Sequence, residues 1–338
     1  MPTVEARAPC RVDLAGGTLD IWPLGLLHPG AITVNVAVGV WVQVTLSERE
    51  SGWEVVLPAG EVELHTRAEL LDREDTALIG RVAEHFALPP ARIELHSESP
   101  QGAGLGASSA LTVALIAACE SFLGHPTGEV EATAHLARDL EAALMSLPTG
   151  IQDHYPALLG GALAIHHQPG GERVESLPVD LDALGRQLIV VYSGHSHFSA
   201  GNNFDVVCRR LRGDSETTAG LGEIAATSQQ MASALARAEL EVVGRLMTEE
   251  WQARRRLSEV ISTPEVEEIL ELAHASGALG GKVCGAGGGG CVALLCPPER
   301  RKNVESAVIG AGYRLLAAAP TASSLELSSD APEVGFRL

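Results

Sequence analysis

A glycine-rich loop that runs directly into an apolar helix constrains this chain more than any other feature. Glycine recurs at Gly102, Gly104 and Gly106, and two serines, Ser108 and Ser109, stand where the following helix is expected to begin. Glycine lets backbone N–H groups turn toward a ligand, and the first turn of a helix adds unpaired N–H groups and the positive end of its dipole. The loop therefore predicts an anion site, most often one for phosphate.

Two named motifs compete for this loop. Gly102, Gly104 and Ala107 match the dinucleotide fingerprint G-x-G-x-x-A. That fingerprint needs a strand after its helix, ending in an acid, whereas a second helix over residues 128–145 is predicted here. No G-K-[ST] sequence follows the loop, so it is not a Walker A motif. Phosphate binding is favoured, dinucleotide binding is the alternative, and a turn that merely packs a helix would not need these glycines and serines.

A second glycine loop, residues 285–290, lies between two apolar runs. Uninterrupted glycine is costly in conformational entropy, so it usually marks close approach of the backbone to a ligand or another segment. We expect this loop to lie against the bound phosphates or against the other domain. A flexible hairpin turn is the alternative.

The net charge and the lengths of the apolar stretches restrict the kinds of partner that the protein can bind. Among 338 residues, 24 are Lys or Arg and 43 are Asp or Glu, which gives a net charge of −19 and argues against a general nucleic-acid binder. The longest apolar stretch, residues 110–119, is shorter than the roughly 20 residues that cross a bilayer. The N-terminus shows no signal-peptide pattern, and the six cysteines form no C-x-x-C pair. We expect a cytoplasmic protein that binds neither nucleic acid nor membrane.

Hydrophobic patterns predict a mixed chain of roughly two domains. We expect strands over 31–46, 53–57, 62–65, 93–96, 162–166, 188–192 and 313–318, and helices over 108–123, 128–145, 222–257, 264–276 and 298–311. Strands and helices do not alternate regularly, which favours an α+β fold over a doubly wound sheet. The Pro- and Gly-rich stretch 168–186 is the candidate crossover, and it divides the chain into domains 1–180 and 181–338.

Several ionisable residues outside the glycine loops could carry chemistry. Arg11, Asp13 and Asp20 surround a Gly-Gly turn, a pattern that a strand followed by a turn would also produce. Glu141 sits beside apolar positions of its predicted helix, and its spacing alone favours a solvated edge residue over a buried functional one. Asp153 lies in a turn-rich loop. A loop carboxylate can act as a general base toward a hydroxyl when the geometry allows contact.

With these segments in hand, the chain resembles the GHMP kinase superfamily over nearly its whole length. The second superfamily motif, P-x-x-x-G-L-G-S-S-A, corresponds to residues 100–110, with Ala107 in place of its first serine. The third motif corresponds to residues 282–290. Residues 15–20 and 150–153 are most similar to the group of D-glycero-D-manno-heptose 7-phosphate kinases, although the first of these segments has one glycine fewer than that group.

The resemblance implies a role for each matching residue. Asp153 would take the proton of the sugar hydroxyl, Arg11 would lie near it and the transferring phosphate, and Ser108 and Glu141 would hold Mg²⁺. The ATP loop would comprise Pro100, Gly102, Gly104, Leu105, Gly106, Ala107, Ser108 and Ser109. The sugar would be bound by Asp20, Gly17, Thr18, Gly287 and Gly288.

The resemblance also implies a fold and a reaction. The N-terminal domain would resemble domain 2 of ribosomal protein S5, the C-terminal domain would be ferredoxin-like, and the active site would lie between them. The expected reaction is ATP-dependent phosphorylation of a sugar or sugar phosphate at its anomeric hydroxyl, with Mg²⁺. A kinase of non-sugar alcohols, of the mevalonate or homoserine type, and a non-catalytic ligand-binding member of the fold are the alternatives.

Some residues keep two interpretations. Lys282 could contact phosphate or bond within its loop, and His195 and His197 could belong to a substrate pocket or to a solvated loop. The basic run 254–256 is typical of a solvated helix face, with binding of an anionic substrate as the alternative. A homodimer is compatible with the sequence.

Overall fold

Two long strands form the centre of the larger of two sheets. The computed structural model describes residues 3–124, 128–194 and 200–329. β1 (Thr3–Ala15) and β2 (Ile32–Glu48) pair antiparallel along nearly their whole length. β2 is rich in Val and Thr, and alternate residues of its second half are buried, as in a strand with one face on a core. The predicted strand over 31–46 is confirmed as one continuous element.

The other strands of this sheet attach to the two halves of β2. Its second half pairs with β5 (Ala91–Ser97), which continues through β3 (Trp53–Leu57) to β4 (Gly60–Leu64). Its first half pairs with β6 (Ala162–Gln168), which pairs with β7 (Gly171–Ser176). β12 (Glu326–Ser329) lies on the outer side of β1. All of these pairs are antiparallel except β3 with β5.

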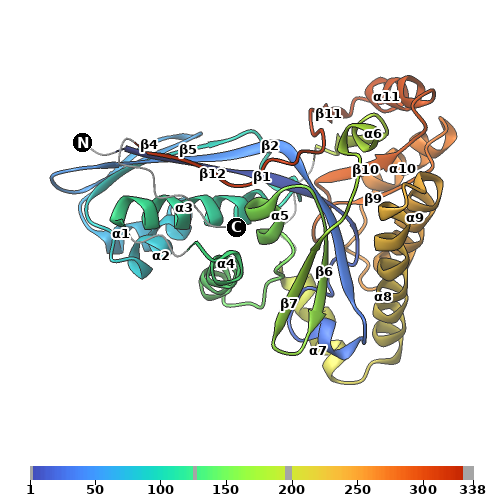
Figure 1. The fold of residues 1–338 in the computed structure, drawn as a ribbon, viewed down its shortest axis with the longest axis horizontal. Coiled ribbons are helices and arrows are strands. Elements are labelled where there is room, and N and C mark those ends of the chain that lie inside the picture. Colours follow the sequence, from blue (N-terminus) through green and yellow to red (C-terminus); the bar gives the residue numbers. More distant parts are fainter. Residues whose placement is uncertain (1–2, 125–127, 195–199, 330–338) are drawn as a thin grey trace.

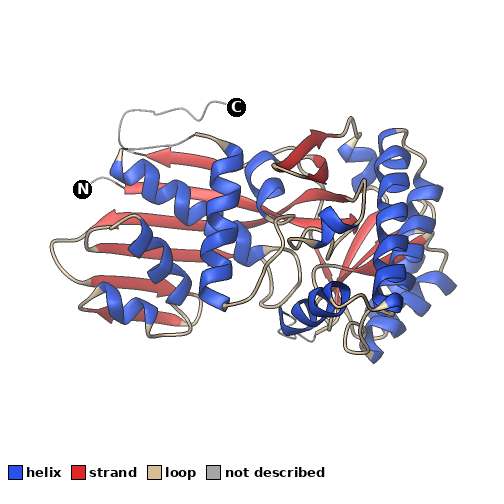
Figure 2. Cartoon of the chain, turned by 90° about the horizontal axis from the view of Figure 1, so that it is seen from below, coloured by secondary structure: helices blue, strands red, loops and turns tan. Residues whose placement is uncertain are grey.

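Helices cover one face of this sheet (Figures 1 and 2). They are α1 (Arg67–Leu71), α2 (Ala77–His85), α3 (Ala107–Leu123), α4 (Val130–Met145) and α5 (His154–Leu159). α3 is apolar on nearly all sides because it lies between the sheet and α4. The predicted helices over 108–123 and 128–145 are confirmed, whereas the shorter helices α1, α2 and α5 are not among the predicted ones.

The second sheet has the order β11-β8-β10-β9 and is antiparallel throughout. Its strands are β8 (Leu188–Tyr192), β9 (Gly280–Val283), β10 (Cys291–Leu295) and β11 (Arg314–Leu316). Its helices are α6 (Leu181–Gly185), α7 (Ala200–Leu211), α8 (Ser215–Ala236), α9 (Leu240–Arg255), α10 (Pro264–Ala275) and α11 (Arg301–Gly310). The predicted helical stretch over 222–257 is confirmed, and residues 237–239 divide it between α8 and α9.

The two halves share their hydrophobic cores. A short 3₁₀ helix, η1 (Leu24–Leu27), lies in the loop between β1 and β2. Leu19, Ile21 and Leu24 of this loop pack into the core of the second sheet. The β1–β2 connection therefore joins the N-terminal half to the C-terminal half, and residues beside it are fixed relative to both.

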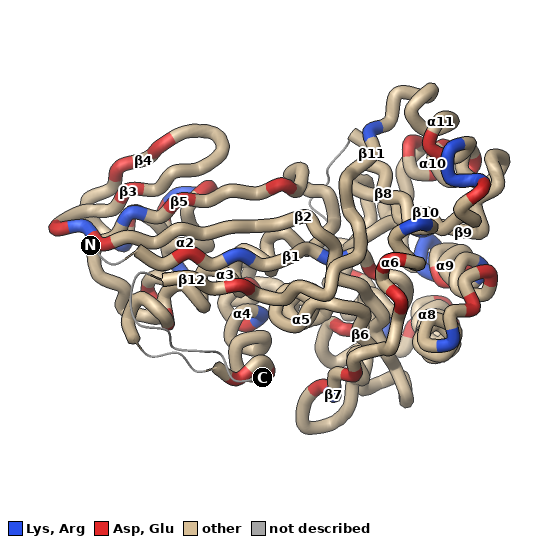
Figure 3. Tube along the Cα trace, turned by 45° about the horizontal axis from the view of Figure 1, so that its top comes forward, with Lys and Arg blue, Asp and Glu red and all other residues tan. Residues whose placement is uncertain are grey.

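The mixed order of strands and helices confirms the predicted α+β class. The stretch 168–186, predicted as a crossover, contains β7 and α6. Because β12 lies on β1, residues 326–329 belong to the first sheet, so a boundary at 180/181 describes only the connection between the halves. Within the described ranges, none of the helices has the length and apolarity to span a bilayer. Figure 3 shows Lys and Arg scattered among more numerous acidic residues.

Candidate active site

Two neighbouring residues on one face of β1 organise the site. Arg11 and Asp13 lie two positions apart in a regular stretch of the strand, so both side chains leave on the same side. Arg11 is 2% exposed and Asp13 is fully buried. Each contacts a different glycine loop: Arg11 the loop at 102–106, and Asp13 the loop at 285–290.

Arg11 joins Asp153 to the first glycine loop. Its Nε donates to Asp153 Oδ1 at 2.7 Å, and its Nη1 donates to the Gly104 carbonyl at 2.6 Å. Burial lowers the pKa of Arg11, but the charges of Asp153 and Asp13 outweigh burial and hold this pKa above its ordinary value. The guanidinium is therefore a fixed positive charge between the predicted base and the predicted ATP loop.

Asp153 lies directly before α5 and against the glycine loop. A Cβ on Gly106 would come within 3.2 Å of the Asp153 side chain. The Asp153 carboxylate remains 24% exposed although its partner Arg11 is buried. This carboxylate can therefore meet a ligand held by the loop, which is the arrangement that a general base requires.

The first glycine loop has the backbone of an anion cradle. Gly102, Gly104 and Gly106 have φ angles of 66°, 72° and 73°, which only glycine adopts readily. No side chain of the described residues caps the N-terminus of α3, so its first-turn N–H groups have no intrahelical partner. Ser108 is exposed at this end. These features fit a phosphate group.

The other predicted loop residues have different surroundings. The carbonyl of Pro100 accepts from the Ala103 N–H at 3.2 Å, which closes a turn at the start of the loop. Leu105 is 1% exposed, and its carbonyl accepts from the Arg11 N–H at 2.9 Å. Ala107 is half-buried at the first position of α3. The side chain of Leu105 therefore anchors the loop in the core, and any contact with ATP would be made by its backbone.

Glu141 is buried at the same end of α3. Ser109 Oγ donates to it at 3.1 Å and Thr112 Oγ1 at 2.8 Å. Nε2 of the fully buried His154 lies 3.3 Å from its carboxylate. Burial lowers the pKa of His154, but the charge of Glu141 outweighs burial and raises it. The interpretation of Glu141 as a solvated edge residue is wrong, and its serine partner is Ser109 rather than Ser108.

Asp20 lies beside the loop that carries the predicted base. The backbone N–H of Gln152 donates to Asp20 Oδ2 at 3.1 Å. Gly150 is required here, because a Cβ would come within 1.9 Å of the same oxygen. Burial and the negative charge of Asp153 raise the pKa of Asp20 to about 6. The structure thus brings Asp20 to the Asp153 loop.

Gly17 and Thr18, also predicted to bind the sugar, occupy a tight turn. A Cβ on Gly17 would come within 2.6 Å of Arg254 Nη1. Thr18 is 3% exposed and has a φ of 77°, unusual for a β-branched residue. Their close packing positions Asp20, and direct contact of either residue with a sugar stays a prediction.

Asp13 belongs to a buried cluster of four charges. It pairs with Lys282 and, at 3.2 Å, with Arg254, and Lys282 also lies 3.2 Å from Glu250. All four side chains are at most 2% exposed. Burial raises the pKa of Asp13, but Lys282 and Arg254 outweigh burial and hold it well below its ordinary value. Lys282 is therefore an internal ion-pair partner.

This cluster holds the second glycine loop at one residue, Gly285. The Gly285 N–H donates to Asp13 Oδ1 at 2.8 Å, and Arg254 Nη2 donates to the Gly285 carbonyl at 2.6 Å. A Cβ on Gly285 would come within 2.7 Å of the Gly104 carbonyl. The second loop therefore lies directly against the first, as expected for a contact with the other half of the molecule.

Gly287 and Gly288 are turned toward the α9–α10 connection. A Cβ on Gly287 would come within 2.8 Å of the Ile261 carbonyl, and the Gly288 N–H donates to that carbonyl at 2.7 Å. Both glycines are buried. The Gly288 N–H is thus already engaged, and contact of these glycines with a substrate stays a prediction.

The buried charges were the part of the site that sequence reasoning missed. The sequence predicts a solvated face for the basic run 254–256, yet Arg254 is buried, and only its neighbours Arg255 and Arg256 are exposed. Helical spacing could have revealed it, because Val243, Met247, Glu250 and Arg254 recur at intervals of three or four on one face of α9. His195 and His197 lie outside the described residues.

Two family models match the chain. The model of the GHMP kinase N-terminal domain matches residues 76–161, which include the first glycine loop, Glu141 and Asp153. The model of the GHMP kinase C-terminal domain matches residues 231–314, which include Arg254 and the second glycine loop.

Curated relatives match over most of their length. A D-glycero-α-D-manno-heptose 7-phosphate kinase from Campylobacter jejuni is 26% identical over 91% of this chain and 94% of its own. A mevalonate kinase from Methanothermobacter thermautotrophicus is 30% identical over 78% of this chain and 83% of its own.

Solved structures show the same fold. A D-glycero-D-manno-heptose 1-phosphate kinase from Bacteroides thetaiotaomicron superposes with a TM-score of 0.76 at 20% identity, covering 96% of this chain and 98% of that one. A galactokinase from Lactococcus lactis also has a TM-score of 0.76, at 15% identity, covering 96% of this chain and 95% of its own. Together with the geometry of the two glycine loops, these matches show that the chain belongs to the GHMP kinase family of ATP-dependent kinases.

Proposed function

We propose that this protein transfers the γ-phosphoryl group of ATP to a hydroxyl of a sugar phosphate, at the anomeric position. The heptose 7-phosphate kinase from Campylobacter jejuni supports this substrate class, since the chain spans 94% of that protein. The contact of Asp153 with both Arg11 and the first glycine loop carries the proposal. In this proposal Asp153 is the base, Arg11 is the cation beside it, and the first glycine loop is the phosphate cradle.

The proposed reaction is a direct displacement. Asp153 accepts the proton of the sugar hydroxyl while the oxygen of that hydroxyl forms a bond to the γ-phosphorus. The bond from that phosphorus to the bridging oxygen breaks, and ADP leaves. Arg11 is a fixed cation beside Asp153, and the N–H groups of the first loop hold the phosphates. Phosphoryl transfer depends mainly on such positioning and charge neutralisation.

Ser108 and Glu141 would hold Mg²⁺ in this proposal. A hydroxyl and a carboxylate are oxygen donors of the kind Mg²⁺ takes, and it is usually bound by one or two carboxylates together with substrate phosphates. Glu141 accepts one hydrogen bond on each oxygen and lies 3.3 Å from His154 Nε2, and an ionised carboxylate has further lone pairs. Bound there, Mg²⁺ would neutralise charge on the ATP phosphates.

A non-sugar alcohol is the second candidate acceptor. The mevalonate kinase from Methanothermobacter thermautotrophicus is more identical to this chain, at 30%, than the heptose kinase is, at 26%. Only a direct comparison of substrates separates the two. Heptose 7-phosphate, galactose, mevalonate and homoserine cover the relevant chemistry.

The test is ADP release from Mg·ATP with each of these compounds, for the wild type and for Asp153→Asn. We expect turnover of a sugar phosphate, and a fall in kcat of about 100- to 10,000-fold in the variant. Asp75→Asn is the matched control, because Asp75 is an exposed carboxylate that pairs with the exposed Arg73. Turnover of mevalonate alone would contradict the proposed acceptor, and full activity of Asp153→Asn would contradict the proposed base.

A further inference from the structure

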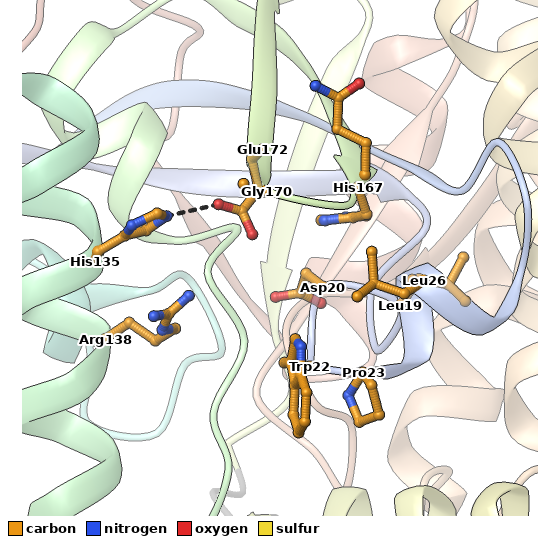
Figure 4. Close-up of a pocket in the computed structure, with 13 residues that line it drawn as sticks. Leu19, Asp20, Trp22, Pro23, Leu26, His135, Arg138, His167, Gly170 and Glu172 are labelled. Atoms are coloured by element: carbon orange, nitrogen blue, oxygen red, sulfur yellow. Dashed lines mark hydrogen bonds and ion pairs between the residues drawn. The ribbon is translucent and has the colours of Figure 1, made fainter.

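A pocket opens beside Asp20 (Figure 4). It encloses about 250 Å³ and lies between the loop that contains η1, helix α4 and the β6–β7 hairpin. Small-molecule sites begin at about 300 Å³, so this pocket suits part of one small ligand rather than a nucleotide. Asp20 lines it and also accepts from the Gln152 N–H, so the pocket adjoins the loop of Asp153.

Trp22 forms an aromatic wall of this pocket. Its side chain is 71% exposed, the highest value among the large exposed hydrophobic residues of the described chain. An exposed indole costs hydrophobic free energy unless a ligand or partner covers it. A sugar has an apolar face of C–H groups that can stack on such a ring while its hydroxyls reach polar neighbours.

Helix α4 supplies the polar wall opposite Trp22. His135 and Arg138 are one turn apart and point into the pocket (Figure 4). Arg138 is the one Lys or Arg among the residues that line the pocket. Its Nε and Nη2 both donate to Asp139 Oδ1, at 3.0 and 2.8 Å, and its Nη1 makes no hydrogen bond within the described chain. That nitrogen can donate to a ligand.

Two carboxylates also line the pocket, and each already accepts a hydrogen bond. Glu172 Oε2 accepts from His135 Nε2 at 2.7 Å and from the Tyr155 hydroxyl at 3.5 Å. Asp20 accepts from Gln152. Carboxylates in this setting are acceptors for sugar hydroxyls, whereas Arg138 is the group suited to an anion.

We infer that this pocket binds the end of the sugar phosphate away from the reacting hydroxyl, with the sugar stacked on Trp22 and its phosphate at Arg138. The inference rests on the proposed function, because it assigns the acceptor side of the same active site. Trp22 would then favour sugars over open-chain alcohols, and Arg138 would favour phosphorylated sugars over free ones.

The test compares heptose 7-phosphate with the free heptose as acceptors for the wild type, Arg138→Met and Trp22→Ala. We expect Arg138→Met to raise the KM for heptose 7-phosphate about 10- to 100-fold and to leave the KM for free heptose and for ATP unchanged. Trp22→Ala should raise the KM for both sugars alike. If free heptose turns over too slowly, its competitive inhibition constant replaces the KM.

Arg173→Met is the matched control. Arg173 neighbours Glu172 on β7 but, by strand alternation, faces the other side, where it pairs with Glu175. An equal KM for heptose 7-phosphate in the wild type and Arg138→Met would overturn the inference while the proposed function stands. Absence of turnover of any sugar or sugar phosphate by the wild type would instead overturn the proposed function.

Discussion

The two glycine loops have similar compositions but opposite surroundings. The first ends at an uncapped helix N-terminus with the exposed Ser108, so its N–H donors can reach a ligand. In the second, the Gly285 N–H bonds to Asp13 and the Gly288 N–H bonds to Ile261. Glycine content alone does not distinguish a ligand cradle from a close packing contact. The distinction lies in where the backbone donors are used.

Two buried aspartates show the same contrast in their charges. Asp13 lies beside the second loop with Lys282 and Arg254, and its pKa is lowered. Asp20 lies near Asp153 and lines the pocket of Figure 4, and its pKa is raised to about 6. Burial alone raises the pKa of both, so the neighbours decide the direction. The charge of Asp13 is compensated by buried cations, whereas Asp20 is an acid for which a ligand can provide partners.

Removing Asp13 should have the largest effect on stability. Asp13→Ala leaves Lys282 and Arg254 with Glu250 as their remaining partner in the cluster, and breaking a buried ion pair costs about 3–5 kcal/mol. Urea unfolding followed by circular dichroism measures the change in the free energy of unfolding, with Asp75→Ala as an exposed control. A loss below about 1 kcal/mol would show that this cluster does not stabilise the region around the second glycine loop.

The pH dependence of Asp20 should have the opposite sign to that of Asp13. The folded pKa of Asp20, about 6, exceeds the unfolded value of 3.8, so the folded state binds more protons and loses stability as pH rises from about 4 to 6. Asp13 has a lowered pKa and loses its stabilisation only as pH falls below the ordinary Asp range. Urea unfolding at pH 4 and pH 7 should show a drop that Asp20→Asn reduces by up to about 3 kcal/mol. An unchanged drop in that variant would contradict the assignment.

Substituting Gly285 should have the smallest effect, and it isolates the contact between the loops. Gly285 and Gly124 have nearly equal φ angles, 69° and 71°, but a Cβ on Gly285 would strike the Gly104 carbonyl, whereas one on Gly124 meets nothing within 4 Å. Gly124→Ala should therefore cost only the left-handed backbone term of about 1–2 kcal/mol. Gly285→Ala should cost more than this in thermal unfolding. Equal costs would mean that the two loops are not in tight contact.

The regular elements and the first loop could be predicted because their signals are local. Val and Thr residues are typical of a strand and indicate β2, and the glycines before α3 indicate a backbone that turns through positive φ angles. Asp153 and Glu141 could be assigned only through the family resemblance, since a loop acid and a helix acid have no distinctive spacing. The cluster of Asp13, Lys282 and Arg254 joins residues up to 269 positions apart, and no local pattern encodes such pairs.

The position of β12 has a consequence for how the chain is made. The strand over 326–329 closes the outer edge of β1, yet it is translated after every element of the second sheet. At about 5–20 residues per second, the ribosome leaves that edge unpaired for on the order of ten seconds or more after β7 has emerged. β1 contains Glu5, Arg7 and Pro9, and charged residues and proline on an edge strand discourage pairing with strands of other chains. The nascent first sheet is therefore protected by its own sequence until Arg7 gains its final partner, Glu326.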